Sequence, residues 1–322
     1  MACAGLVAAL LMYPANAAQG ATKRSTADRP DAIRGYQIHV IYFVPDDAKD
    51  RRLDVDGTIA RGLAGMQRWF ADQSGGLRWR LDVVRSSLQP DITFVRGEQQ
   101  TAKYLDGSFL TTVRPELQQR GFARADANYL VFFDGPAPDS PVCGEALYPI
   151  PGVTDYTPAR SGYPVVRGFS FVQLQGSPGC KSHDWGTVER PGHVPATMMH
   201  ELMHPQGLVA PGAPNTCDPT LLLNPGHVCT VKFPLANTEE GAALDPQRRD
   251  LMYPALVEPL WNQVLDIGND DYFDAGLLAR LDLRDSPFVT GDGHDARRLA
   301  NAVPVADPTQ WTSVSLPHPA GE

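Results

Sequence analysis

The sequence has little of what several protein classes require. Cysteine is scarce, with five residues in 322, and no pair has the C-x-x-C spacing that a zinc site built from thiolates favours. Basic residues are in deficit, because 28 Lys and Arg face 37 Asp and Glu, for a formal net charge of -9. There is no basic cluster of the kind that neutralises nucleic-acid phosphates or an anionic membrane surface. We therefore expect neither a nucleic acid nor a membrane as a partner.

The motifs of several common enzyme chemistries are also absent. The chain has no G-x-S-x-G nucleophile elbow, no G-x-x-x-x-G-K-[ST] phosphate loop and no G-x-G-x-x-G after a strand. Hydrolysis through an activated serine of that type, nucleotide binding on such a loop and dinucleotide redox chemistry are therefore disfavoured.

The N-terminus has the pattern of a secretory signal. Residues 1–18, "MACAGLVAALLMYPANAA", run from an apolar core into an A-x-A-like end, although no Lys or Arg precedes the core. No other segment approaches the roughly 18 apolar residues that cross a bilayer. The polar residues 19–35 are typical of a flexible leader. We expect a secreted, extracellular protein, with a periplasmic location as the other possibility.

Removal of the signal would leave an even number of cysteines, which suits an oxidising compartment. These are Cys143, Cys180, Cys217 and Cys229. Four cysteines allow three pairings. We favour Cys143 with Cys180 and Cys217 with Cys229, since the second pair would close a short loop at little entropic cost.

Strands and helices alternate along the chain. Strands are predicted at 36–44, 77–84, 91–95, 128–135 and 168–176, and helices from Thr58 to the "SGG" at 74–76 and over 101–121. Between them, residues 135–165 are so rich in Pro and Gly that they predict an irregular surface excursion. The pattern indicates an α+β fold, a mixed β-sheet packed on helices, in one domain over 36–290 with a C-terminal tail at 291–322.

The most specific motif is "HELMH" at residues 200–204. Pro195 or Thr197 can begin a helix, on which His200 and His204 lie one turn apart on the same side, so both imidazoles can reach one ion. Glu201 lies where it can take a proton from a water activated by that ion. Pro205 predicts that the helix finishes at the second histidine. An ordinary amphipathic helix with polar residues on its solvated face is the alternative.

Two histidines do not complete a catalytic zinc site, which usually has three protein ligands. The long pattern H-E-x-x-H-x-x-G-x-x-H is matched through Gly207 and fails at Ala210. Together with "GHVC" (226–229), "DLMYP" (250–254) and "DIGNDDYFD" (266–274), the motif resembles a group of secreted bacterial metzincin-like zinc metalloproteases over about residues 36–290. The resemblance implies a displaced third ligand and a methionine turn beneath the metal, matched here by Met252.

The third ligand has several candidates. Asn215 stands where the resemblance leads us to expect a histidine, which leaves His227. This histidine would be held in a small loop if Cys217 pairs with Cys229. Asp218 is the second candidate, and Glu239 or Glu240 would supply a ligand from a helix.

Other residues near the motif have simpler interpretations. Tyr253 could donate to a developing oxyanion, but a buried core tyrosine is favoured. The acidic residues of 266–274 could hold calcium, but they lack the EF-hand spacing and a solvated turn is favoured. His193 is not counted as a ligand, because Pro195 intervenes.

The sequence thus predicts a secreted zinc (Zn2+) metallopeptidase acting on a protein or peptide, with Glu201 as general base and His200, His204 and His227 as metal ligands. A zinc-dependent amidase acting on a cell-wall or other non-peptide amide would use the same residues. A non-catalytic secreted protein that retains a structural metal is the third possibility. The side-chain preference and the oligomeric state do not follow from the sequence.

Overall fold

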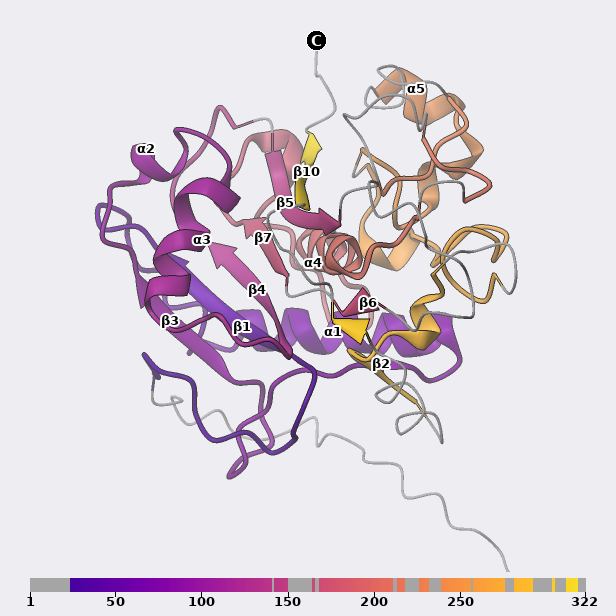
Figure 1. Cartoon of the computed structure of the whole chain (residues 1–322). Helices are drawn as coiled ribbons and strands as arrows, with labels where there is room; N and C mark the ends of the chain where they lie inside the picture. The colour runs from indigo at the N-terminus through magenta and orange to yellow at the C-terminus, as the bar shows by residue number, and fades with distance from the viewer. Residues whose placement is uncertain are drawn as a thin grey trace, which may run out of the picture.

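The fold is seen in a computed structural model of the chain (Figure 1). The structure describes residues 24–140, 142–149, 164–165, 168–210, 213–217, 226–231, 239–255, 257–275, 281–291, 303–304 and 311–317. The signal peptide and the first part of the leader lie outside these residues, so both stay predictions.

A six-stranded mixed sheet forms the centre of the fold. Its order is β10-β5-β7-β4-β1-β3. The bounds are Trp311–Pro317 for β10, Val142–Pro149 for β5, Phe169–Gln173 for β7, Ala127–Phe133 for β4, Gln37–Val44 for β1 and Ile92–Arg96 for β3. Strands β3, β1, β4 and β7 are parallel, whereas β5 runs antiparallel to both β7 and β10. The parallel strands are nearly continuous apolar runs, as expected of strands covered on both faces.

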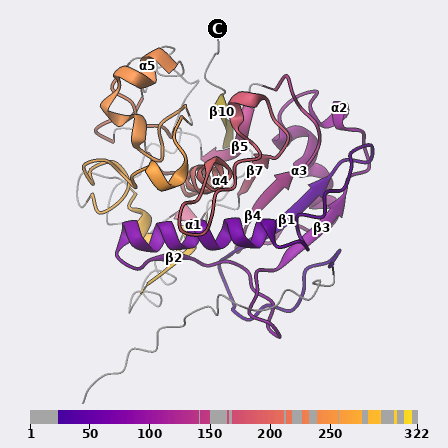
Figure 2. The ribbon, with the colours of Figure 1, turned by 180° about the vertical axis from the view of Figure 1, so that it is seen from behind.

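Helices cover both faces of the sheet (Figures 1 and 2). On one face, α1 (Thr58–Ser74) and α4 (His193–Met203) pack against the side of β1 that carries Val40. On the other face, α2 (Thr101–Tyr104) and α3 (Phe109–Gln119) accompany the side that carries Ile41. Gly75 ends α1 in a left-handed conformation at φ 72°, which suits glycine because it has no Cβ.

Smaller elements complete the described fold. Two short ladders join β2 (Arg78–Trp79) to β8 (Val289–Thr290) and β6 (Pro164–Val165) to β9 (Val303–Pro304). The short helix α5 (Glu239–Leu244) follows α4 in the sequence and is coloured orange in Figure 1. Among the described residues, no helix is long and apolar enough to span a membrane.

The structure confirms most predicted elements and corrects three. Residues 77–84 are not one strand, because only Arg78–Trp79 pairs as a strand and the rest makes isolated bridges. The helix predicted over 101–121 is two helices, since the chain turns at Gly107 (φ 132°) and restarts at Ser108, whose side chain caps α3. The excursion at 135–165 is not wholly irregular, because it contains β5.

Both ends of the described chain join the sheet. Ser25 forms a bridge to Thr93 beside β3, and Arg24 pairs with Asp50 and Asp54, so the part of the predicted leader from Arg24 onward is held in place. At the opposite edge, β10 of the predicted tail pairs with β5. The favoured disulfides are confirmed, with Cys143 bonded to Cys180 and Cys217 to Cys229.

Candidate metal centre

The helix that carries the H-E-x-x-H motif starts earlier than Thr197. It begins at His193, with Pro195 in its first turn, and ends at Met203. A 3-10 turn over His204–Gln206 follows and stops at Gly207, which has a φ of 72°. The α-helix therefore finishes at the second histidine, as Pro205 predicts.

Three histidine rings meet at the end of α4. The Nε2 atom of His200 lies 3.0 Å from Nε2 of His204 and 3.1 Å from Nε2 of His227. All three residues have no exposed surface. Among the described residues they form one of the groups whose ring nitrogens or carboxylate oxygens could hold a single ion.

The segment 250–252 positions two of these histidines. The Nδ1 atom of His200 lies 2.6 Å from the carbonyl oxygen of Leu251. A carbonyl only accepts, so Nδ1 carries the proton and Nε2 presents its lone pair to the other rings. The carbonyl of Met252 accepts from the backbone N–H of Val228, directly after His227. The buried carboxylate of Asp250 accepts from the N–H of Met252 and so holds this segment in turn.

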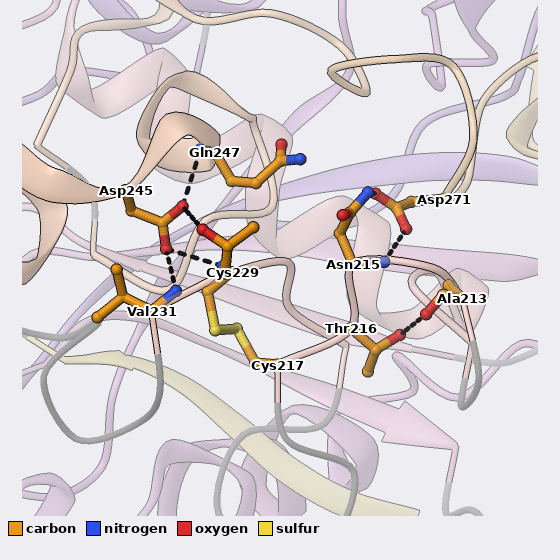
Figure 3. The surroundings of a disulfide bond; sticks show 10 residues. Ala213, Asn215, Thr216, Cys217, Cys229, Val231, Asp245, Gln247 and Asp271 are labelled. Carbon is orange, nitrogen blue, oxygen red and sulfur yellow. Dashed lines mark hydrogen bonds between the residues drawn. A yellow bond between two sulfur atoms is a disulfide. The ribbon is translucent and has the colours of Figure 1, made fainter.

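His227 lies in a loop that is closed by the disulfide between Cys217 and Cys229. Figure 3 shows this disulfide and its surroundings. The carbonyl of His227 accepts from the N–H of Cys217, and the N–H of Cys229 donates to Asn215, so the disulfide closes a short two-stranded contact around the histidine. Asn215 also donates to Asp271. The residue that stands in place of the histidine expected from the resemblance is thus part of the support of the His227 loop.

The carboxylate of Glu201 is buried in the site without a hydrogen-bond partner among the described residues. The residue has no exposed surface, and both carboxylate oxygens lack a partner within that part of the chain. A Cβ on Gly144 of β5 would stand 2.5 Å from Oε1 of Glu201, so only glycine leaves room for the carboxylate there. An unpaired buried carboxylate is costly, which indicates a site made for a charged or proton-donating ligand.

Burial sets the charge states of the site. It lowers the pKa of His200 to about 4, although the hydrogen bond to Leu251 opposes the shift. It also lowers the pKa of His204 well below its usual range, helped by the two neighbouring histidines. Burial raises the pKa of the Glu201 carboxyl well above its usual range, and the charge of Glu145 adds to the shift. The rings of His200 and His204 are therefore neutral, which is the form that binds a metal.

The donor set fits a zinc ion. Ligand nitrogens at 2.0–2.1 Å from a tetrahedral ion stand about 3.3 Å apart. This is close to the 3.0 and 3.1 Å between Nε2 of His200 and the Nε2 atoms of His204 and His227. Direct hydrogen bonds would satisfy this arrangement less well, because Nε2 of His200 has one lone pair and two ring nitrogens facing it.

The site is covered by strand β5. The ring of Tyr148 lies edge-on to His204, with the ring centroids 6.1 Å apart, and its hydroxyl donates to the carbonyl of Val209. Sequence reasoning missed Tyr148 and Gly144, since both fall in the stretch that predicts an irregular excursion. It also missed Asp250 and Leu251, because nothing in "DLMYP" shows that a backbone carbonyl will meet a histidine 51 residues away.

The other described candidates do not join the three histidines. Asp218 is outside the described residues. Glu239 begins α5 and Glu240 is exposed, and neither belongs to the histidine group. Tyr253 is buried beside the Cys217–Cys229 disulfide, in agreement with a core tyrosine. His193 bonds to Asp184 and Lys181 and takes no part in the cluster.

The acidic run at 266–274 is not a solvated turn throughout. Asp266 and Asp271 are buried, and Asp270 is half-buried. The carboxylate of Asp266 accepts backbone N–H groups of the residues that follow it, including Tyr272 and Phe273. The carboxylate of Asp266 thus binds the backbone of its own loop, whereas those of Asp270 and Asp271 accept from Asn215.

Comparison with known proteins gives distant matches only. No known family and no curated protein matches the sequence. Crystal structures of wild-type OgpA from Akkermansia muciniphila match 60% of this chain and 52% of that chain, at 17% identity and a TM-score of 0.34. A catalytically inactive OgpA in complex with an O-glycopeptide (glycodrosocin) matches over the same shares at 16% identity and the same TM-score. The chain thus spans about half the length of these proteins.

Proposed function

We propose that the chain is a secreted zinc-dependent metallopeptidase that hydrolyses a protein or peptide. The observation that carries the proposal is the Glu201 carboxylate, buried without a partner on the helix that presents His200 and His204. The rings of His200, His204 and His227 would hold the ion. The two disulfides favour secretion.

The chemistry divides between the ion and the chain. A bound zinc ion supplies Lewis-acid chemistry, because it acidifies a water and polarises a carbonyl. Glu201 takes the proton of the attacking water and delivers it to the leaving amine. Burial raises the pKa of this carboxyl and the charge of a bound ion lowers it, and these opposing effects suit a group that accepts a proton and gives it up again. Leu251 keeps His200 in one tautomer throughout, and buried Met252 supplies an apolar floor.

Substitution of Glu201 by Gln tests the proposal. The amide keeps the size of the side chain and loses its function as a base, so zinc should remain at about one per chain while peptide hydrolysis falls by a factor of about 10² to 10⁴. Zinc content after dialysis and turnover of a peptide library are the measurements. A panel of N-acyl and cell-wall amides, run in parallel, separates a peptidase from an amidase. Full activity of the variant would contradict the assigned base.

A second function, a structural metal site without catalysis, is favoured by one observation. None of the four site residues has exposed surface. Replacement of zinc by Co²⁺ distinguishes the two functions, because a catalytic site keeps a position for water. A visible spectrum that changes with pH and on addition of a hydroxamate supports catalysis. A spectrum insensitive to both indicates a closed structural site.

A further inference from the structure

A second group of ligand-type side chains lies at the start of β1, on the sheet face opposite α4. It consists of Asp28, His39 and Asp82, whose ligand atoms all lie within 4.8 Å of one another. The ring of His39 packs on the α3 side of the sheet, near Phe122 and Tyr129. The proposed peptidase chemistry uses none of these residues.

Three separate segments bring the group together. His39 belongs to β1, and the backbone N–H of Asp82 donates to the carbonyl of Ile38, which sets Asp82 next to the histidine. Asp28 comes from the N-terminal segment that bridges to β3 through Ser25. Any ligand shared by the three residues would therefore tie the N-terminal segment to the sheet.

The contacts of the His39 ring resemble those of a metal ligand. Its Nδ1 atom lies 2.7 Å from Oδ2 of Asp82 and 3.8 Å from Oδ1 of Asp28, while Nε2 lies 3.0 Å from the hydroxyl of Thr93. A metal-bound histidine typically donates its other ring N–H to a polar partner, and Thr93 can accept here. A ring nitrogen that faces two carboxylates requires a positive charge between them, either a proton or a cation.

Asp82 distinguishes these two occupants. Its side chain has no exposed surface, and Oδ1 has no hydrogen-bond partner among the described residues. A proton on Nδ1 of His39 satisfies only Oδ2. A cation at the centre of the group also gives Oδ1 and the carboxylate of Asp28 a partner.

The surrounding charges leave a negative excess. Asp31 and Asp91 face the group and, after burial itself, raise the pKa of Asp82 and of Asp28. The nearby arginines are occupied, because Arg29 pairs with Asp91, and Arg124 pairs with Asp31 and Asp126. Arg124 reaches Asp28 only at 3.8 Å. A divalent cation would neutralise this excess.

We propose that Asp28, His39 and Asp82 bind a divalent transition-metal ion, distinct from the ion of the three histidines. One imidazole and two carboxylates suit Mn²⁺, because this ion favours oxygen ligands. A site of three imidazoles suits zinc better. The Asp28 side chain is 37% exposed, so water can complete the coordination. The ion fastens the segment that carries Asp28 to β1.

Manganese titration of the full chain tests the site. One equivalent of Zn²⁺ is added first for the three histidines, and Mn²⁺ binding is then followed by the loss of the free-ion EPR signal. We expect one Mn²⁺ per chain in the unmodified protein and binding at least about tenfold weaker in Asp28→Asn. Mn²⁺ should also raise the Tm of the unmodified protein and leave that of Asp28→Asn unchanged.

Two control variants make the result specific. Asp31→Asn removes a charge from the same segment without removing a ligand, and Asp270→Asn alters a separate acidic group, that of Asp266, Asp270 and Asp271. Asp270→Asn should bind Mn²⁺ like the unmodified protein, and Asp31→Asn, which lowers the negative excess but keeps all three ligands, should lose less affinity than Asp28→Asn. No Mn²⁺ uptake, equal uptake by Asp28→Asn, or a loss confined to Asp270→Asn overturns the proposal. The contact between His39 and Asp82 is then a buried ion pair.

Discussion

The ring nitrogen Nδ1 of His200 lies 2.6 Å from the carbonyl oxygen of Leu251, which comes 51 residues later in the chain. This contact fixes the tautomer and the orientation of a histidine whose other nitrogen faces the two remaining rings. Mutation of outer partners of this kind typically costs about 10- to 100-fold in metal affinity. The position of Leu251 depends in turn on Asp250, whose carboxylate accepts from Met252, Ile267 and Tyr272.

Substitution of Asp250 by Ala should therefore weaken zinc binding without touching a ligand. The change leaves the N–H groups of Met252 and Ile267 and the hydroxyl of Tyr272 without their acceptor. We expect zinc affinity, measured by chelator competition, to fall about 10- to 100-fold. The free energy of unfolding should fall by about 3 kcal/mol, because buried donors lose their partner.

A matched control separates lost positioning from lost stability. Asp134 is an equally buried carboxylate, but it binds Tyr42 and Arg51 at the end of β4 and has no contact with the histidines. Asp134→Ala should destabilise the fold by a similar amount and leave zinc affinity unchanged. Equal losses of affinity in both variants would show that Asp250 acts only through global stability.

Substitution of Gly144 by Ala should displace the base while the metal stays bound. The added Cβ would stand 2.5 Å from Oε1 of Glu201 and 2.7 Å from the methyl of Thr197. The carboxylate is the flexible partner and should move. Misplacement of a catalytic group by about 1 Å costs on the order of 10² in rate. Peptide turnover should fall by that factor at unchanged zinc content, whereas Gly176→Ala, which meets its nearest atom at 3.3 Å, should behave like the parent.

The two disulfides should differ in what their removal affects. They join residues 12 and 37 apart, and loop-closure entropy assigns about 3 kcal/mol to the shorter loop and about 4 kcal/mol to the longer one. Replacement of Cys143 and Cys180 by Ser should therefore lower the free energy of unfolding more. Replacement of Cys217 and Cys229 should lower zinc affinity more, because this bond closes the loop of His227. Denaturant titration measures the loss of stability, and chelator competition measures the loss of zinc affinity. If replacement of Cys143 and Cys180 caused the larger loss in both measurements, the role assigned to the Cys217–Cys229 disulfide would be contradicted.

The sequence predicts the parts of this protein that depend on local pattern. The spacing of His200 and His204 on a helix is local, and so are the apolar runs of β1 and β4, because strands buried on both faces need no alternation. Strand β5 was missed because Pro and Gly surround it, although its burial comes from pairing with β7 and β10, far away in the chain.

The contacts that position the three histidines and Glu201 could not be predicted from local pattern. The sequence indicates His227 as a candidate ligand, because it lies two residues before Cys229. The contacts of Leu251 and Met252 are made by backbone carbonyls, which every residue has, so the sequence does not indicate them. The role of Gly144 follows from the missing Cβ, and a sequence does not show which glycines have a neighbour at that distance. Side-chain chemistry is visible in the sequence, whereas close backbone approach is visible only in the fold.

Zinc binding should release a proton from Glu201. Burial raises the pKa of this carboxyl well above its usual range, so the metal-free protein holds the proton there to a higher pH than an ordinary glutamate does. A nearby cation favours the ionised carboxylate and expels that proton. His200 contributes almost none, because its pKa of about 4 leaves it already neutral at pH 6. Since binding releases a proton, zinc affinity should rise with pH, by up to about tenfold per unit while Glu201 is protonated.

Calorimetric titration at pH 6 in two buffers of different ionisation enthalpy gives the number of protons released. We expect about one proton more for the unmodified protein than for Glu201→Gln, which has no proton to lose. The variant should also bind zinc with an affinity that is nearly independent of pH down to about pH 6 and falls as the pH approaches 4, where His200 takes up a proton. Equal proton release by both proteins would place the carboxylate of Glu201 away from the ion and leave the proposed base without its electrostatic link to the metal.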